Sequence, residues 1–399
     1  MIENLGPLQN VPGDLHELIG GHTCVRFEYE HHRPYLKNPE PITLQVVLGL
    51  EGTSLQCLIA EQLPKDVDSL EEMSRFLNRQ PVNLTAPLPL DPVYIPKPWG
   101  REIWFSGIEE RGVSTCREIP IAWLLDIFGL HLGCTTAPLL LKILDPLPDE
   151  NIGDLYFELH TEKVEVYVVT HVDRSAWPDG VGQIRYGFDQ SLLAEYDSSA
   201  AFLGAYRDAV RDYERVRRQI DSGITGLETE ERQLRQNMYR FTALQQIRQG
   251  DVITVEPLVP HSLQHGVRVI EFQTPHYERY ILSFGQQVVT QDHWNTDQAL
   301  EVARLDGRPF KGDQTNDIIA DFDQFRVQRI QIEPGSAVSL GADRYQILIG
   351  IQGSLSYGPG TLINPESAWF LPPAGNDVEI YNHTEQPGTF LRATETRLP

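Results

Sequence analysis

The stretch from Gly153 to Tyr167, GDLYFELHTEKVEVY, constrains the fold more than any other part of the chain. Glu158 and His160 stand two residues apart in an alternating run that is typical of a strand, so both side chains are expected on one face. After a turn-like Thr-Glu-Lys segment the chain re-enters a strand, in which Glu165 follows His160 by five residues. A short hairpin would therefore bring two carboxylates and one imidazole together, which is most of a divalent-metal site.

The remaining ligand is expected from a second strand region, GDVITVEPLVPHSLQHG, in which Gly250 opens a strand and a proline-rich turn delivers His261. Each of these residues has a structural alternative, because a strand histidine can be a hydrogen-bonded core residue and a strand glutamate can face water. Burying two carboxylates on one face without a cation would be strongly unfavourable, however, so the set predicts a metal site. Mixed nitrogen and oxygen ligands suit zinc, which we expect, and also iron, manganese or nickel.

These two segments resemble the paired motifs of the cupin superfamily. Gly153, Glu158, His160 and Glu165 occupy the places of the first motif, with a glutamate where the first histidine would stand. Gly250, Pro257 and His261 occupy the places of the second motif.

The surrounding residues resemble the type I phosphomannose isomerases over roughly residues 95–290. APLLLKILDPLPDENIGDLYFELH is similar to the segment that leads into their Gln-x-His pair, and KVEVY is similar to their Lys-x-Glu-x-Trp/Tyr motif. GDVITVEPLVPHSLQHGVRVIEFQ is similar to the strand pair that carries their second-motif histidine. The resemblance implies an enzyme that interconverts mannose 6-phosphate and fructose 6-phosphate with one bound metal ion. It places Lys163 and Glu271 beside the metal for proton transfer, and it gives Arg279 the role of steadying negative charge or positioning the substrate.

The resemblance and the strand patterns together predict a mainly β protein, with two cupin (jelly-roll) barrels, a helical insertion and an N-terminal β-rich extension. The expected segments are an N-terminal extension over 1–95, a metal-binding cupin over 96–189 and 249–300, a helical hairpin over 190–248 and a degenerate C-terminal cupin over 301–399. At its metal positions the second cupin offers Arg344, Tyr345, Gln346 and Val378, which cannot assemble a ligand set.

Local patterns predict several helices. SLEEMSRFLNRQ reads as a short helix capped by Ser69, and IPIAWLLDIFGLHLG reads as a buried helix that ends near Gly133. AAFLGAYRDAVRDYERVRRQID has apolar residues at close to helical spacing. A second helix is expected to run through LETEERQLRQNMYRFTALQQIRQG as far as Gly250. The neighbouring His31 and His32 point to opposite faces of a strand, so they are expected to be surface residues and not joint metal ligands.

Composition excludes several classes of partner. A formal net charge of −23 argues against nucleic acid and against anionic membranes, and no apolar run approaches the roughly 20 residues of a membrane span. The first residues lack a basic start and an apolar core, so we expect a cytoplasmic protein with a small-molecule sugar phosphate as its partner. The four cysteines have no CxxC spacing and are expected to be reduced and mostly buried. Candidates for binding an anionic substrate are Lys97, Arg101, Lys142, Lys163, Arg268 and Arg279.

Two other functions remain open from the sequence. One is a different metal-dependent cupin reaction, such as an oxygenase or an isomerase of an unphosphorylated sugar. The other is a sugar-binding or scaffold protein without catalytic activity.

Overall fold

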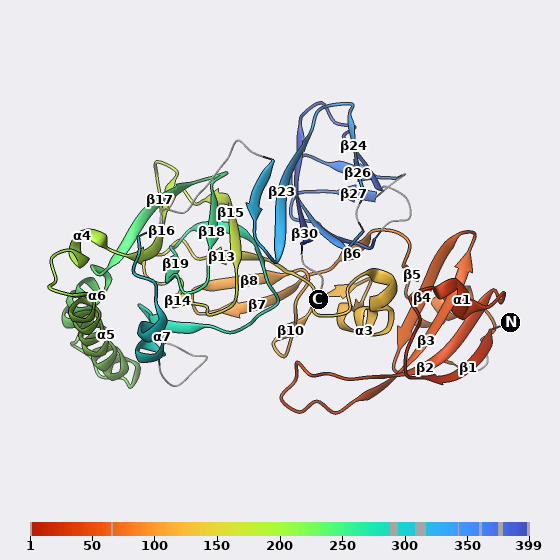
Figure 1. The fold of residues 1–399 in the computed structure, drawn as a ribbon, viewed down its shortest axis with the longest axis horizontal. Coiled ribbons are helices and arrows are strands. Elements are labelled where there is room, and N and C mark those ends of the chain that lie inside the picture. Colours follow the sequence, from red (N-terminus) through yellow and green to blue (C-terminus); the bar gives the residue numbers. More distant parts are fainter. Residues whose placement is uncertain are drawn as a thin grey trace. The chain divides into compact units, whose positions relative to one another are not determined.

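The computed structural model describes residues 2–64, 67–287, 294–307, 317–341, 343–358, 361–373 and 378–396. The chain divides into two compact units. The first unit contains Met1–Ile95, Trp104–Lys142 and Asn316–Pro399, and the second contains Pro96–Ile103 and Ile143–Thr315. Antiparallel sheets dominate both units, which confirms the predicted mainly β class (Figure 1).

The first unit begins with a sheet in the order β1-β2-β3-β4-β5, in which β1 alone runs parallel to its neighbour. The side chains of Val25, Phe27, Val46 and Leu58 are fully buried, as expected for strands with one face on a core. Ser69 caps α2 as predicted, because its hydroxyl accepts the N–H of Glu72 at 3.2 Å. The elements are β1 (Glu3–Leu8), α1 (Leu15–Ile19), β2 (Cys24–His31), β3 (Ile42–Glu51), β4 (Ser54–Ala60), α2 (Leu70–Leu77) and β5 (Val82–Asn83).

The prediction of two surface histidines is wrong for His31 and right for His32. His31 is buried, with 2% of its surface exposed, and its Nδ1 lies 2.6 Å from Oδ2 of Asp126. Asp126 belongs to helix α3 (Ile121–Leu132), which is distant in sequence, so no local pattern could place it beside β2. His32 is 69% exposed and lies 3.2 Å from Glu30.

Helix α3 ends as predicted, with Gly133 in the left-handed conformation at φ 69°. Two short hairpins precede it, and their strands are β9 (Ile108–Glu109), β10 (Gly112–Val113), β11 (Thr115–Cys116) and β12 (Ile119–Pro120).

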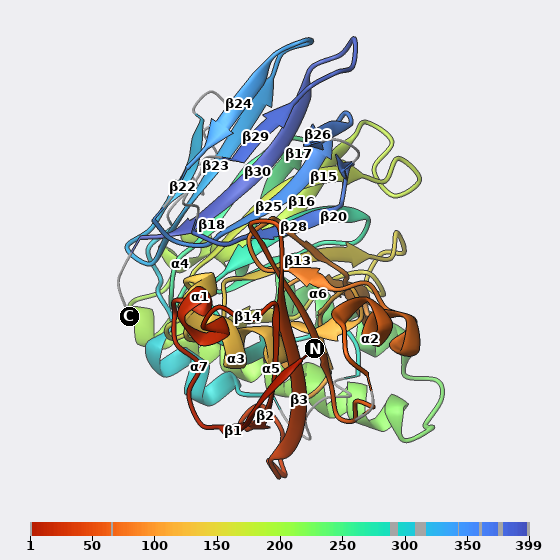
Figure 2. The ribbon, with the colours of Figure 1, turned by 90° about the vertical axis from the view of Figure 1, so that its right-hand side faces the viewer.

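The C-terminal part of the first unit is a β-sandwich (Figure 2). One sheet has the order β22-β23-β30-β25-β28-β6 and the other has the order β24-β29-β26-β27. Leu348 and Phe390 from the first sheet pack in one apolar cluster with Leu340 and Ile380 from the second, so the core lies between the sheets. The strands are β6 (Leu88–Leu90), β22 (Ile318–Asp321), β23 (Phe325–Ile332), β24 (Ala337–Leu340), β25 (Gln346–Gln352), β26 (Leu355–Tyr357), β27 (Thr361–Ile363), β28 (Ala368–Leu371), β29 (Val378–Tyr381) and β30 (Gly388–Glu395).

The second unit is a barrel of two facing sheets, to which helices are added. One sheet has the order β18-β15-β20-β13-β8-β7 and the other has the order β17-β16-β19-β14-β21. Val169 and Val267 from the first sheet join Ile184 and Leu263 from the second in one buried cluster. The strands are β7 (Val93–Lys97), β8 (Gly100–Trp104), β13 (Leu140–Pro146), β14 (Phe157–Leu159), β15 (Glu165–Val172), β16 (Val181–Phe188), β17 (Thr242–Arg248), β18 (Val252–Val255), β19 (His261–Leu263), β20 (Val267–Gln273) and β21 (Tyr280–Ser283).

Helices of the second unit are α4 (Gln190–Leu193), α5 (Ser199–Asp221), α6 (Glu228–Tyr239) and α7 (Thr296–Val302). Helix α5 packs its apolar face, including Phe202, Tyr206 and Tyr213, into the barrel's cluster, as its helical spacing predicts.

The predicted second helix of the insertion is too long. It ends at Tyr239, and residues 242–248 form strand β17. Strand β17 pairs with β16 from Thr242 opposite Phe188 to Arg248 opposite Val181, so its backbone hydrogen bonds extend the barrel sheet. The tertiary pairing outweighs the helix propensity of Ala, Leu, Gln and Arg in the segment TALQQIR. In the part of the chain that the structure describes, no helix is long and apolar enough to span a membrane.

Candidate metal centre

Strand register in the second unit brings the predicted ligands together. Strand β14 lies between β19 and β21, and Glu158 is the direct cross-strand partner of His261. His160 follows immediately after β14, while Glu165 begins β15 in the opposite sheet. The expected hairpin between these two strands is therefore wrong, because β14 pairs with β19 and β21 whereas β15 pairs with β18 and β20. The side chains of His160, Glu165 and His261 are at most 3% exposed, and that of Glu158 is 19% exposed. The cluster therefore lies between the two sheets, close to solvent only at Glu158.

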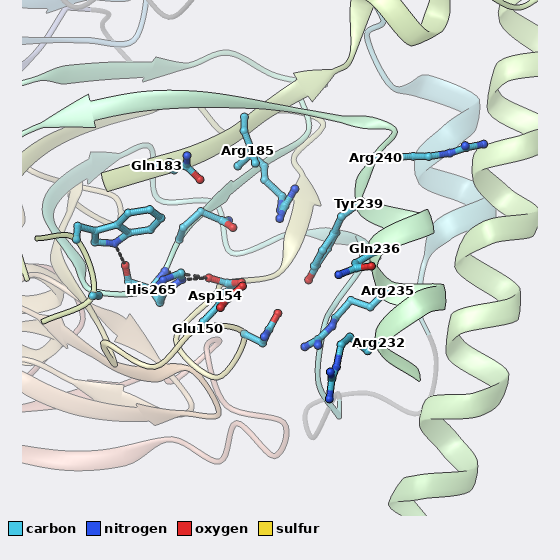
Figure 3. A pocket seen from close by; sticks show the side chains of 15 residues that line it. Glu150, Asp154, Gln183, Arg185, Arg232, Arg235, Gln236, Tyr239, Arg240 and His265 are labelled. Carbon is cyan, nitrogen blue, oxygen red and sulfur yellow. Dashed lines mark hydrogen bonds and ion pairs between the residues drawn. The ribbon is translucent and has the colours of Figure 1, made fainter. Parts of the chain in front are cut away.

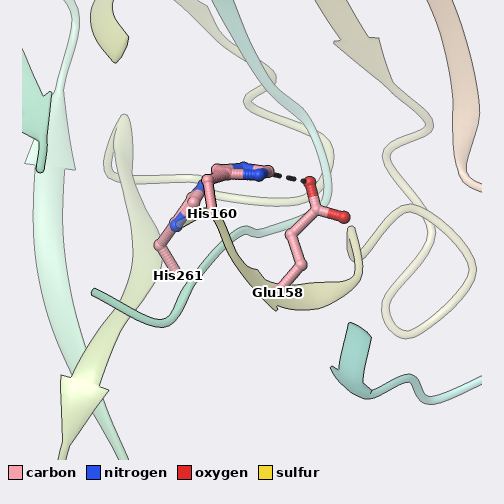
Figure 4. Close-up of side chains that lie close together, drawn as sticks. All are labelled: Glu158, His160 and His261. Carbon is pink, nitrogen blue, oxygen red and sulfur yellow. Dashed lines mark ion pairs between the residues drawn. The ribbon is translucent and has the colours of Figure 1, made fainter. Parts of the chain in front are cut away.

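Both histidines point their Nε2 atoms into this cluster (Figure 4). The Nδ1 atom of His160 lies 2.8 Å from the backbone oxygen of Glu278, and that of His261 lies 3.0 Å from the backbone oxygen of Val259. A carbonyl oxygen can only accept, so each Nδ1 is the donor to the backbone, and Nε2 is the nitrogen that each ring turns toward the cluster. Neither Nε2 atom has a hydrogen-bond partner among the described residues, although both are buried.

The distances in the cluster are close to those that a bound ion needs. Nε2 of His160 lies 3.8 Å from Oε1 of Glu158 and 3.6 Å from Oε1 of Glu165. Nε2 of His261 lies 3.1 Å from Oε2 of Glu165 without hydrogen-bond geometry. Tetrahedral ligands at about 2.0–2.1 Å from zinc are separated by about 3.3 Å. Glu158, His160 and His261 can therefore hold a metal ion after small side-chain movements, since their ligand atoms already lie within 4.8 Å of one another.

Glu165 is held in place by two other side chains. Its Oε1 lies 2.5 Å from Nζ of Lys163, and its Oε2 accepts a hydrogen bond from the hydroxyl of Tyr167 at 2.7 Å. Burial raises the pKa of Glu165, but Lys163 and the histidines outweigh that effect and lower it well below the usual value. The carboxylate is thus ionised and oriented toward both histidines.

Electrostatics favour the protonation states that a metal requires. Burial, together with the positive charge of Lys163, lowers the pKa of His160, which keeps its ring neutral. Burial raises the pKa of Glu158, but Arg279 and His160 outweigh it, so this pKa is also lowered. Neutral imidazoles and ionised carboxylates are the ligand forms that bind divalent ions.

The three residues expected to take part in catalysis lie around the cluster. Lys163 is 7% exposed and contacts Glu165 directly. Glu271 is completely buried on β20, opposite Tyr167 of β15. The guanidinium of Arg279 lies 4.8 Å from the centre of the Tyr156 ring, and its charge acts on Glu158.

Most of the cations considered for an anionic substrate are bound to carboxylates. Nζ of Lys97 lies 3.1 Å from Glu102, and both Arg101 and Arg268 approach Asp145 within 2.7 Å. The simplest explanation of these contacts is that the three residues have structural roles.

Sequence reasoning missed Glu278 as a part of the site. Its Oε1 accepts the backbone N–H groups of Thr161, Glu162 and Lys163 at 3.0, 2.9 and 3.2 Å. Burial raises the pKa of Glu278, but these bonds and His160 lower it to about 2. Glu278 therefore fixes the turn between the ligand strands, and no local signal marks it because its partners are more than 110 positions away.

Among the described residues, one group of at least three side chains is arranged to hold a metal ion: Glu158, His160 and His261. In the C-terminal β-sandwich, Tyr345, which the sequence placed at a metal position of the second cupin, is buried and its hydroxyl donates to Glu395 at 2.6 Å.

Comparison with solved structures gives the fold a name. The mannose 6-phosphate isomerase of Bacillus subtilis matches with a TM-score of 0.54 and 18% identity, over 77% of this chain and 99% of that one. The apo form of the mannose 6-phosphate isomerase of Salmonella typhimurium matches with a TM-score of 0.55 and 10% identity, over 78% of this chain and 100% of that one. The chain has the mannose 6-phosphate isomerase fold. A mannose 6-phosphate isomerase bound with zinc and yttrium matches with the same TM-score of 0.55 and 10% identity, over 78% of this chain and 100% of that one. No protein-family model matches the chain, and no curated protein matches it.

Proposed function

We propose that the chain is a metal-dependent aldose–ketose isomerase that interconverts mannose 6-phosphate and fructose 6-phosphate. One observation supports the proposal: two buried histidines direct Nε2 atoms, which have no hydrogen-bond partner among the described residues, toward the carboxylates of Glu158 and Glu165. Burying bare acceptors in this way costs free energy unless a cation completes the site. The fold shared with mannose 6-phosphate isomerases supports the choice of reaction.

The ligands in this proposal are Glu158, His160 and His261, with Glu165 as the fourth, and zinc is the expected ion. The mixed nitrogen and oxygen donor set suits zinc, and a mannose 6-phosphate isomerase of this fold is bound with zinc. When bound, a divalent ion supplies Lewis-acid polarisation of the oxygens at C1 and C2 of the open-chain sugar.

The surrounding residues would supply the proton transfers. Isomerisation removes the proton at C2 of the aldose and returns a proton to C1, while the hydroxyl proton at O2 is lost and one is gained at O1. Lys163 and Glu271 are the proposed acid–base groups, since Lys163 is buried in contact with Glu165 and Glu271 is buried opposite Tyr167. Arg279 would balance negative charge that develops on the substrate, as it already does for Glu158.

The test is a coupled assay for fructose 6-phosphate formation from mannose 6-phosphate, with zinc-loaded protein and a chelated control. We expect turnover that the chelator abolishes and added zinc restores. Metal binding without turnover would contradict the substrate assignment and direct the assay to unphosphorylated sugars. Consumption of oxygen by iron-loaded protein would instead indicate an oxygenase. Absence of metal, with unfolding unaffected by chelation, would indicate a protein without catalytic activity.

A further inference from the structure

A separate pocket of about 830 Å³ lies between strand β16 and helix α6 of the second unit (Figure 3). Ile184 and Tyr186 of β16 point into the barrel core, so Gln183 and Arg185 point to the outer face, where the pocket lies. Glu158, His160 and His261 do not line it. Its volume is in the range of small-molecule sites.

Three arginines extend from two elements toward this pocket (Figure 3). Arg232 and Arg235 lie three residues apart and share one face of α6. Arg185 reaches over from β16, with its guanidinium stacked 3.9 Å from the centre of the Tyr239 ring and Nη1 donating to Thr242 at 2.9 Å. The stacking holds the planar donor group in a defined orientation.

The arginines retain unused donor capacity. Within the described residues, Arg185 and Arg232 have no carboxylate in ion-pair range, and the buried Nε of Arg185 has no hydrogen-bond partner. Arg235 has only a distant contact, with its Nε 3.7 Å from Oε1 of Glu231. By contrast, Arg217 and Arg218 on helix α5 are closely paired with Asp221 and Glu214. In a chain with a net charge of −23, carboxylates are abundant, so a group of arginines without close partners marks a place for an external anion.

The opposite wall of the pocket suits hydroxyl groups. Asp154 binds His265 at 2.7 Å, and the His265 ring stacks on Trp177 with centroids 4.7 Å apart. On the same side Gln183 adds an amide donor and acceptor, and Gln264, whose Nε2 already donates to the backbone oxygen of Ser262 at 2.9 Å, adds an amide oxygen. A ligand that is charged at one end and rich in hydroxyls at the other would satisfy both walls.

We propose that this pocket binds a phosphorylated, hydroxyl-bearing small molecule, with the phosphate on Arg185, Arg232 and Arg235. Arginine forks match phosphate oxygens bidentately, and the volume leaves room for a polyol or sugar body against Asp154, Gln183 and Gln264. This second site is independent of the proposed isomerase reaction.

The test is isothermal titration calorimetry of the full chain with sorbitol 6-phosphate. Sorbitol and inorganic phosphate are the comparison ligands. The titration is repeated on His261→Ala, which removes a proposed metal ligand and leaves the pocket intact. We expect sorbitol 6-phosphate to bind both proteins at this pocket and sorbitol to bind neither. Binding that disappears in His261→Ala would place the phosphate at the metal centre and overturn the proposal, whatever the outcome of the isomerase assay.

Two variants and one control locate the binding. Arg232→Gln and Arg185→Gln are each expected to weaken sorbitol 6-phosphate binding by about tenfold or more, because each removes a charged hydrogen-bond donor. Arg215→Gln makes the same charge change on α5, where the side chain is exposed near Asp212, and is expected to change affinity less than about twofold. Equal affinities in all three variants would overturn the proposal. Arg232 is exposed, so its variant tests the pocket even where Arg185→Gln fails to fold.

Discussion

At the scale of the residue, His160 and His261 differ from ordinary buried histidines in how their two ring nitrogens are used. A core histidine usually satisfies both nitrogens, whereas each of these donates from Nδ1 to a backbone carbonyl and leaves Nε2 without a hydrogen-bond partner among the described residues. Orientation of the ring through its second nitrogen is the arrangement found around protein metal ligands.

The first prediction concerns metal content. His261→Ala should lower bound zinc from about one ion per chain to well below half an ion, because the site loses one of its two imidazoles. Elemental analysis after dialysis against a weak chelator measures this. His32→Ala, at an exposed position, is the control and should retain full metal. Full zinc occupancy in His261→Ala would contradict the proposed ligand set.

The second prediction concerns Lys163. Lys163→Ala should lower kcat for the isomerase reaction by more than about tenfold, as expected for loss of an acid–base group. The same change leaves Glu165 without its ion-pair partner, so thermal unfolding of the metal-loaded variant must be measured beside the kinetics. Lys37→Ala, which alters an 84% exposed lysine, is the control. A loss smaller than about tenfold in folded Lys163→Ala would remove Lys163 from the mechanism.

At the scale of the element, close packing of loops positions the ligand strands. Gly153 precedes β14, and its N–H donates to the backbone oxygen of Asp149 at 2.8 Å. A Cβ at this position would overlap the backbone oxygen of Leu147, which itself accepts the N–H of Gly266 at 2.9 Å. The glycine thus lets two backbone segments approach at the start of the ligand strand.

The third prediction follows from that contact. Gly153→Ala should lower the free energy of unfolding by about 2–3 kcal/mol, because a backbone atom cannot move aside as a flexible side chain can. Gly204→Ala in α5, where an added Cβ meets nothing within 4 Å, should instead raise stability by up to about 1 kcal/mol through helix propensity. Urea unfolding of both variants checks this pair. A neutral Gly153→Ala would show that this loop can shift.

At the scale of the whole molecule, all four cysteines of the chain lie buried in the first unit. Cys24, Cys57, Cys116 and Cys134 are all free and buried, which confirms the expectation of reduced, buried cysteines. Burial raises the pKa of Cys24 to about 11 and those of Cys116 and Cys134 to about 12. The thiolate is the reactive form, so these cysteines should be inert in the folded protein.

The fourth prediction is that native protein at pH 8 reacts with a chromogenic disulfide reagent at much less than one thiol per chain over several minutes. After unfolding in guanidinium chloride, all four cysteines of the chain should react. Rapid modification of one thiol in the native protein would show that part of the first unit opens readily.

Much of the fold was predictable from local patterns. The period of alternation and the capping residues identify the strands and helices, as at Ser69 and Gly133. The prediction failed where a distant partner decided the outcome. Residues 242–248 are a strand because β16 lies beside them, and His31 is buried because Asp126 comes from a helix 95 positions away.

The sequence alone indicated which residue types stand at the candidate metal centre, because the strand-like spacing of Glu158 and His160, followed by Glu165 and by His261 after a second strand, is typical of metal ligands. Only the tertiary structure decided the protonation and orientation of these groups, since Lys163, Tyr167, Glu278 and Val259 act on them through contacts across strands and loops. The arginine pocket likewise depends on α6 facing β16. Hydrogen bonds and charges act over a few ångströms in space. Residues that are far apart in the sequence come within that range only when the chain folds.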